Sequence, residues 1–377
     1  MLNKRKKKNM YVPDEEVLAY NRAKDEEPVV SDATIDSEDA ADEAIESNQA
    51  EPIKEDSAVK VSFIKKVLNF FPNKNDTPKN LIIKIVAIIA AIALIVTGTY
   101  LSVYFIDLGH QDAKINNIRN DYELHRDDYT KNQDNQFAKF NFLKTQNKDI
   151  VGWVTIPNTE VNNPVYQTYD NEFYVTHDME KKPNSYGALF LDYRCDVNPM
   201  SLTRNQIIYG HNMRYGAMFG TLDEYRELSF YKENPLIHFD SLYEKRVYKI
   251  FAIMIVNDGE DETFGYNFTA YRSSFLDDTD FMTWIDHCRQ RSLVDTTVDI
   301  NANDEIITMS TCCYDYEDAR LVVLGRLVRP NEDEAVNTAD AAKNEDVIYS
   351  GKYYAKKKLP VPKIEEPTES DTTSSDK

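Results

Sequence analysis

The stretch ITMSTCCYDYEDARLVVLGRL, residues 307–327, carries the strongest structural signal in the chain. Residues 306–312 and the residues from Ala319 onward are rich in β-branched and apolar side chains, and a short acidic turn separates the two runs. If these runs pair as an antiparallel hairpin, Arg320 stands at the start of the return strand, across from Cys312. A guanidinium in that place would be able to hold a substrate carbonyl or stabilise an oxyanion.

A structural role for this cysteine is the alternative. Cysteine attacks as a thiolate, and a free thiol has a pKa of about 8.5, so a catalytic cysteine needs a cation or base beside it. His211 is the preferred base, ahead of His177 and His238, because it closes a strand-like run through Gly210. From spacing alone, however, a buried free cysteine beside a surface arginine is favoured, and a lone histidine is more often structural.

The strand-like pattern of this hairpin extends over residues 151–328. Short β-branched and aromatic runs alternate with turn residues, and they read GWVTIP, NPVYQ, GALFLDY, NQIIYGH, VYKIFAIMIV, EIITMSTC and ARLVVLGRLV. Many short strands of this kind predict an all-β barrel or sandwich. Residues 275–293 differ, because their apolar residues recur at helical spacing behind an Asp- and Thr-rich start, which predicts a helix inserted between strands. Residues 111–150 predict one or two helices leading into this domain.

A long apolar run lies nearer the N-terminus. Residues 85–106 contain 22 residues without a charge. At about 1.5 Å per residue, such a helix crosses a hydrocarbon core of roughly 30 Å. The run starts too late and is too long for a secretory signal peptide. Lysines are concentrated before it and aspartates come first after it, so the positive-inside rule predicts a cytoplasmic N-terminus and an extracellular remainder.

Both ends of the chain have the composition of disordered segments. Residues 1–80 are predicted to be a disordered cytoplasmic region, and residues 331–377, rich in Pro, Glu, Ser and Thr, a disordered C-terminal tail. Much of the formal charge of −20 belongs to residues 14–57, which hold 16 Asp and Glu against 3 Lys and Arg. No domain-wide basic surface is implied, so we do not expect nucleic-acid binding.

Metal and cofactor motifs do not occur in the sequence. The four cysteines are too few and too scattered for a disulfide scaffold, and neither CxxC nor HExxH is found. The GxxxxGK[ST] phosphate loop and the GxSxG nucleophile elbow are absent as well. We therefore expect neither a metal ion nor a cofactor.

Four blocks of the sequence, in the right order, resemble class B sortases, the cysteine transpeptidases of Gram-positive bacteria. They are DIVGWVTIPNTEVNNPVYQTYDNEFYVTHD (149–178), GALFLDYR (187–194), IIYGHNMRYGAMFGTL (207–222) and residues 307–327. The family signature TLxTC is similar to Thr308–Cys312, with Met309 in place of Leu. The resemblance covers about residues 110–329 and leaves out both tails.

The resemblance implies an all-β fold, the eight-stranded sortase β-barrel with N-terminal helices and one inserted helix, preceded by a single transmembrane helix. It implies a catalytic domain over 111–330 and a catalytic set of Cys312 as nucleophile, His211 as acid, base or ion-pair partner, and Arg320 as the group that positions substrate and stabilises the oxyanion. It also implies that three further residues line the substrate groove, namely Ser310, Asn171 and Val175.

The implied reaction is transpeptidation. The thiolate would cut a C-terminal sorting signal after Thr, and an amine of a lipid-linked peptidoglycan precursor would resolve the thioester, anchoring a surface protein to the cell wall. Single-pass anchoring in the cell membrane would bring the enzyme to both partners. Two alternatives stay open: a pilus-polymerising enzyme with a pilin lysine as acceptor, and a catalytically silent, membrane-tethered binding module.

Overall fold

The computed structural model describes residues 70–213 and 216–362 of the chain. The chain divides between Ile92 and Ala93 into two units, and the second unit contains the barrel. The first long element, helix α3 (Pro78–His125), contains the predicted span 85–106. Its residues Pro78–Ile106 are long and apolar enough to cross a membrane, and no other helix in the described part of the chain is. Most of the predicted disordered region 1–80 lies outside the described residues.

The last turns of α3 pack on the barrel. Ile115, Ile118 and Tyr122 recur at helical spacing and are buried. The Tyr122 ring stacks on Trp153, with the ring centroids 3.9 Å apart and the planes at 2°. Burial of two large aromatic side chains face to face fixes this helix end to the first strand. Helices η1 (Ala138–Phe140) and α4 (Asn141–Gln146) complete the predicted N-terminal helices.

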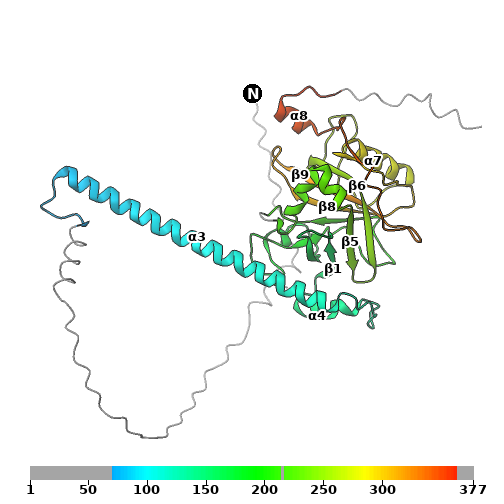
Figure 1. The fold of residues 1–377 in the computed structure, drawn as a ribbon, viewed down its shortest axis with the longest axis horizontal. Coiled ribbons are helices and arrows are strands. Elements are labelled where there is room, and N and C mark those ends of the chain that lie inside the picture. The colour runs from blue at the N-terminus through cyan, green and yellow to red at the C-terminus, as the bar shows by residue number, and fades with distance from the viewer. Residues whose placement is uncertain (1–69, 214–215, 363–377) are drawn as a thin grey trace, which may run out of the picture. The chain divides into compact units, whose positions relative to one another are not determined.

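Eight strands close into a barrel in the order β1-β2-β3-β4-β8-β9-β6-β5 (Figure 1). Their bounds are β1 (Ile150–Thr155), β2 (Asn162–Tyr166), β3 (Leu189–Leu191), β4 (Asn205–Tyr209), β5 (Leu236–Ser241), β6 (Lys245–Asn257), β8 (Ile306–Cys312) and β9 (Ala319–Leu327). Three short helices lie between them: α5 (Phe173–Thr176), η3 (Gly220–Arg226) and α6 (Leu228–Glu233). The predicted eight-stranded barrel is thus confirmed.

The β8–β9 hairpin fills the gap between β4 and β6. Strand β8 pairs in parallel with β4, and β9 pairs antiparallel with β6 along nine residue pairs. Both strands of the hairpin are buried along most of their length, because the barrel interior covers one face and the neighbouring elements cover the other. The hairpin therefore completes the barrel wall between β4 and β6.

The predicted inserted helix is also confirmed, with tighter bounds. Helix α7 (Asp278–Gln290) lies between the sixth and seventh strands of the barrel. Its N-cap Asp277 accepts a hydrogen bond from the backbone N–H of Asp280 at 2.8 Å, which satisfies one of the open amides of the first turn. The buried face includes Phe281 and Trp284, both without exposed surface. An apolar stripe at helical spacing thus fixes α7 on the barrel.

The C-terminal segment corrects one prediction. Residues 331–362 were expected to belong to a disordered tail, yet they are ordered in the structure and include strand β10 (Ala342–Lys343) and helix α8 (Gly351–Lys357). Strand β10 pairs with β7 (Val294–Asp295), which follows α7. Aromatic residues explain the order, because Tyr354 is buried and its neighbour Tyr353 packs against the core. Residues 363–377 lie outside the described residues.

Candidate active site

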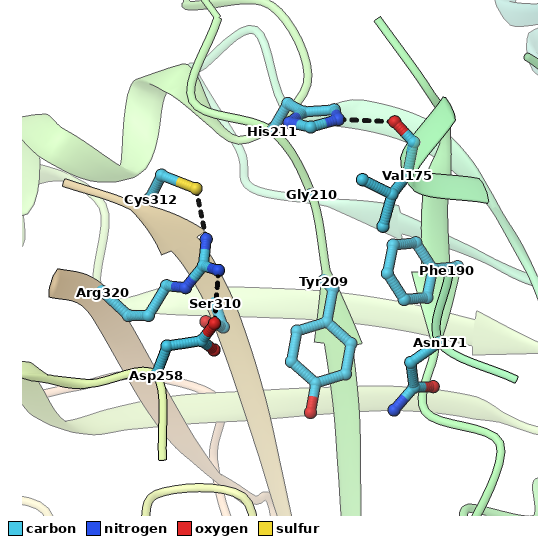
Figure 2. Close-up of a pocket in the computed structure, with 10 residues that line it drawn as sticks. All are labelled: Asn171, Val175, Phe190, Tyr209, Gly210, His211, Asp258, Ser310, Cys312 and Arg320. Carbon is cyan, nitrogen blue, oxygen red and sulfur yellow. Dashed lines mark hydrogen bonds and ion pairs between the residues drawn. The ribbon is translucent and has the colours of Figure 1, made fainter. Parts of the chain in front are cut away.

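The register of the β8–β9 hairpin brings a thiol and a guanidinium together. Cys312 and Arg320 are direct partners in the antiparallel ladder, as the spacing predicted. Arg320 donates from Nη1 to the Sγ of Cys312. From Nη2 it donates to Asp258 Oδ2 at 2.7 Å (Figure 2). One guanidinium therefore contacts the sulfur and a carboxylate at the same time through two different nitrogens. A lysine ammonium has only one nitrogen and does not offer this geometry.

The carboxylate of Asp258 comes from the end of strand β6. Asn257 pairs with Ala319, and the backbone N–H of Asp258 donates to the carbonyl of Asp318 at 2.9 Å. Burial of Arg320 opposes its charge, but the hydrogen bond and the charge of Asp258, together with the nearby Cys312 and Tyr271, outweigh burial and hold the guanidinium pKa above its ordinary value. The cation is thus permanent and held in place.

The parallel pair β4–β8 brings a histidine to the same end of the barrel. Tyr209 is opposite Ser310 in the register, so His211 and Cys312 each follow two residues beyond the paired positions. The Asn212 side chain donates from Nδ2 to the carbonyl of Cys312 at 2.8 Å. Two segments that lie about a hundred residues apart are thereby tied at the carboxyl ends of adjacent parallel strands, which is a common location for functional groups in open sheets.

The imidazole of His211 is oriented by a backbone carbonyl. Its Nε2 lies 2.7 Å from the carbonyl oxygen of Val175, in the segment after β2. A carbonyl only accepts, so Nε2 carries the proton in this contact and Nδ1 is left for acid–base chemistry. In the part of the chain that the structure describes, His211 and Cys312 share no hydrogen bond; Arg320 is the group that contacts the sulfur.

Gly210 permits the His211 strand end to pack closely. A Cβ at this position would lie 2.3 Å from Leu189 Cδ2 and 2.8 Å from Phe219 Cδ2. Glycine is therefore required here for close approach, and the tight bend inferred from the sequence is not its main reason. Gly187 differs, since its φ of +58° is left-handed and a Cβ there would lie 2.4 Å from the Tyr174 carbonyl.

A cleft of about 360 Å³ contains all six residues that the sequence proposed for the site. Its lining residues are Asn171, Val175, Phe190, Tyr209, Gly210, His211, Asp258, Ser310, Cys312 and Arg320. Figure 2 shows Arg320 between Cys312 and Asp258, and the His211 ring beyond Tyr209 and Gly210 on the same segment, directed toward Val175. His177 and His238 are not among the lining residues. The cleft thus combines a nucleophile candidate, a cation and an imidazole.

Two of the residues that line the cleft, Asn171 and Tyr209, belong to a hydrogen-bonded polar network. Asn171 donates from Nδ2 to Asp192 Oδ2 at 2.9 Å, and the Tyr209 hydroxyl donates to the same oxygen at 2.9 Å. Burial of Asp192 raises its pKa, but hydrogen bonds from Arg194 outweigh this, and its pKa stays below the ordinary value. The network fixes the position of the Asn171 carboxamide in the lining of the cleft.

Environment separates Cys312 from the other three cysteines. All four are free thiols, but only Cys312 is partly exposed. Burial raises the pKa of Cys195 and of Cys313 to about 12, and it raises the pKa of Cys288 well above the ordinary value. Buried neutral thiols are poor nucleophiles, so Cys312 is the only described cysteine suited to attack.

Among the described residues, no group of three or more His, Cys, Asp or Glu side chains is arranged to hold a metal ion.

Sequence reasoning missed two residues of the site, Asp258 and Asn212. Each acts on a partner far away in the chain, Asp258 on Arg320 and Asn212 on the carbonyl of Cys312. Only the pairing of β6 with β9 and of β4 with β8 would have identified them. Asn212 lies in the block 207–222, but nothing in that block assigned it a role, and no local motif marks Asp258.

Comparison with known proteins gives one consistent family. The Sortase domain model matches residues 154–328. Sortase B of Listeria monocytogenes is 36% identical over 188 residues, covering 49% of this chain and 72% of that protein. Sortase B of Staphylococcus aureus is 27% identical over 247 residues, covering 65% of this chain and 96% of that protein.

Solved structures agree with the sequence relatives. Sortase B from B. anthracis superposes with a TM-score of 0.52 at 29% identity, covering 60% of this chain and all of that chain. A Staphylococcus aureus sortase B–substrate complex gives a TM-score of 0.52 at 26% identity, covering 59% of this chain and 99% of that chain.

Proposed function

The chain belongs to the class B sortases, and from this membership we propose that it cleaves a C-terminal sorting signal after Thr and joins the surface protein to an amine of a peptidoglycan precursor. Membership implies a cysteine transpeptidase in general. The observation that most directly supports the proposal for this chain is that the Arg320 guanidinium contacts both Cys312 and Asp258. All three residues line a cleft that His211 also lines.

In the first step, Cys312 Sγ attacks the threonyl carbonyl carbon, and the carbonyl oxygen gains negative charge. Arg320 is the cation beside the sulfur, so it stabilises that oxyanion. For Sγ to attack, the thiol proton passes to His211 Nδ1, the ring nitrogen that is not engaged by Val175. The C–N bond then breaks, and the leaving amine takes this proton from Nδ1. The product is a thioester between the surface protein and Cys312.

In the second step, an amine attacks the thioester carbon and the C–S bond breaks. His211 takes the proton that the attacking amine loses, and Arg320 stabilises the second oxyanion and the departing thiolate. The acceptor is proposed to be the amine of a lipid-linked wall precursor, which a membrane-anchored enzyme meets at the outer face of the membrane. Helix α3 supports such an anchor. The lysines before the span favour an orientation with the N-terminus inside and the barrel outside.

Two other functions fit parts of this picture. A pilus-polymerising enzyme would use the same residues with a pilin lysine as the acceptor. A silent binding module would keep the barrel without turnover, but the thiol, the guanidinium and the imidazole all line the cleft, which favours an enzyme.

Intact mass spectrometry of the full-length chain in detergent, incubated with a library of sorting-signal peptides, tests the proposal. We expect an added acyl mass on the wild type and none on Cys312→Ala. Cys313→Ala is the matched control, since this neighbouring thiol is buried, and it should still be acylated. Absence of an acyl-enzyme on the wild type, or its persistence in Cys312→Ala, would sink the enzyme assignment.

A further inference from the structure

The C-terminal segment 342–357 follows the barrel and lies beyond residue 328, where the family match ends. It is attached to the end of helix α7. Besides the β10–β7 pairing, Asn344 donates from Nδ2 to the carbonyl of Ser292 at 2.8 Å. The backbone N–H of Ile348 donates to the carbonyl of Gln290 at 2.9 Å. These contacts hold the chain along the end of α7 as far as Ile348, two residues before the Ser350 cap of α8.

Helix α8 packs against the loop that joins β6 to α7, residues 258–277. A Cβ on Gly351 would lie 2.1 Å from Thr263 Oγ1, so only glycine allows this approach. The Tyr354 ring, which is buried, meets Phe264 edge to face, with centroids 6.3 Å apart. Ser350 caps the helix by accepting from the Tyr353 N–H. The same loop supplies Asp258 to the cleft.

The adjacent residues of α8 contact the turn that joins Cys312 to Arg320, residues 313–318. The Tyr353 ring meets buried Tyr316 edge to face, with centroids 6.4 Å apart and planes at 83°. Lys352 Nζ lies 3.2 Å from Asp318 Oδ2. This ion pair is exposed and weak, so the aromatic contact is the stronger of the two.

We propose that residues 342–357, the C-terminal brace, hold the 258–277 loop and the 313–318 turn together and thereby position Arg320 against Cys312. Both supports end on Arg320: the turn precedes it in the chain, and the loop supplies the Asp258 carboxylate that binds it. The two supports are joined directly by the hydrogen bond from Asp258 N–H to the Asp318 carbonyl. Brace residues are positioning residues, and the inference rests on the proposed transpeptidase function.

Kinetics of the full-length protein in detergent test the brace. Gly351→Ala forces α8 away from Thr263, and Tyr353→Ala removes the contact with Tyr316. Because Arg320 acts on charge that develops in the transition state, each variant should lower kcat about tenfold while KM changes less than about twofold. Tyr353→Phe keeps the ring and should restore wild-type kcat. Lys356→Ala, on the exposed part of the same helix, should leave kcat unchanged.

A second readout does not depend on turnover. The alkylation rate of Cys312 by iodoacetamide reports on the contact between its sulfur and Arg320, and Cys312→Ala gives the background. Tyr353→Ala should slow alkylation by about threefold or more. If both brace variants lower the thermal midpoint but change neither kcat nor the alkylation rate, the segment only stabilises the fold and the proposal is overturned. If the wild type forms no acyl-enzyme, the proposed function fails, and the alkylation rates still decide the brace.

Discussion

At the scale of single residues, Arg320 is the most constrained group of the site. Its two terminal nitrogens contact different partners, the sulfur of Cys312 and the carboxylate of Asp258. Lysine would supply the same charge at a single point and lose one of these contacts. Asp258 touches no reacting atom in the proposed mechanism, so its contribution passes through Arg320.

A double-mutant cycle tests this dependence. Arg320→Lys should lower kcat by about a hundredfold, and Asp258→Asn by about tenfold, since an unheld guanidinium stabilises the oxyanion less well. The double variant should be no slower than Arg320→Lys alone, because Asp258 then has nothing left to orient. Glu317→Gln removes an exposed nearby charge and serves as the control. Multiplicative losses in the double variant would contradict the dependence.

At the same scale, the sequence pointed to the proposed catalytic residues but not to their partners. Cys312, His211 and Arg320 carry side chains that suggest chemistry, and the family resemblance singled them out. Asp258 sits at the end of a long strand and looks like any surface carboxylate. Its role depends on a strand pairing between residues about sixty positions apart, and single-sequence patterns do not encode such pairings.

At the scale of elements, close packing of β4 against its surroundings fixes the His211 strand end. The ring of Phe219 and the side chain of Leu189 occupy the space that a side chain at Gly210 would need. Any added methyl group has to displace one of them or move the backbone that carries His211.

Gly210→Ala should therefore destabilise the protein by about 1–3 kcal/mol and lower kcat, because overpacking shifts the histidine. Gly259→Ala is the matched control, since a Cβ at Gly259 meets nothing within 4 Å. Thermal unfolding and peptide cleavage, measured on both variants, give the comparison. Equal effects of the two substitutions would show that close packing at Gly210 is not what holds the histidine.

Strand prediction succeeded where apolar runs were continuous. Seven barrel strands correspond to the seven runs read from the sequence, whereas β5 (LIHFDS) was not recognised because His238 and Asp240 interrupt its pattern. The count of eight came from the family resemblance. Helix α8 was missed for a different reason: its lysines and the Pro- and Ser-rich surroundings resemble a tail, and only tertiary contacts of Tyr353 and Tyr354 order it.

At the scale of the whole molecule, two half-buried histidines make stability depend on pH. Burial lowers the pKa of His238 on β5 and of His287 on α7. Among the described residues, His238 Nε2 and His287 Nδ1 are buried without a hydrogen-bond partner. Protonation is therefore easier in the unfolded chain than in the folded one.

The sign follows from the lowered pKa values. Well above the ordinary histidine pKa of about 6.5 both histidines are neutral in both states, and as the pH falls toward and through that value the unfolded chain takes up protons first. The free energy of unfolding should thus fall between about pH 7 and pH 5. Urea unfolding of wild type and of His238→Gln/His287→Gln measures the effect, and the double variant should show a flatter dependence. An equally steep decline in both proteins would exclude the histidines as its source.

The proposed orientation of the chain has its own test. All four cysteines follow the apolar span, and three of them are buried. A membrane-impermeant thiol reagent should therefore label Cys312 on intact cells, and Cys312→Ala should abolish the label. Labelling only after permeabilisation would place the barrel inside and refute the orientation.

The position of the β8–β9 hairpin in the chain also sets when the Cys312 thiol appears during synthesis. A chain is synthesised from its N-terminus, and this hairpin is the last part of the barrel to be made. Until it arrives, β4 and β6 have no neighbour between them, and neither Cys312 nor Arg320 exists. The unfinished chain is then both an open sheet with two unpaired edges and a protein without a nucleophile. Closure of the barrel and the appearance of the Cys312 thiol are one event, so a chain that lacks the hairpin exposes no thiol at this site.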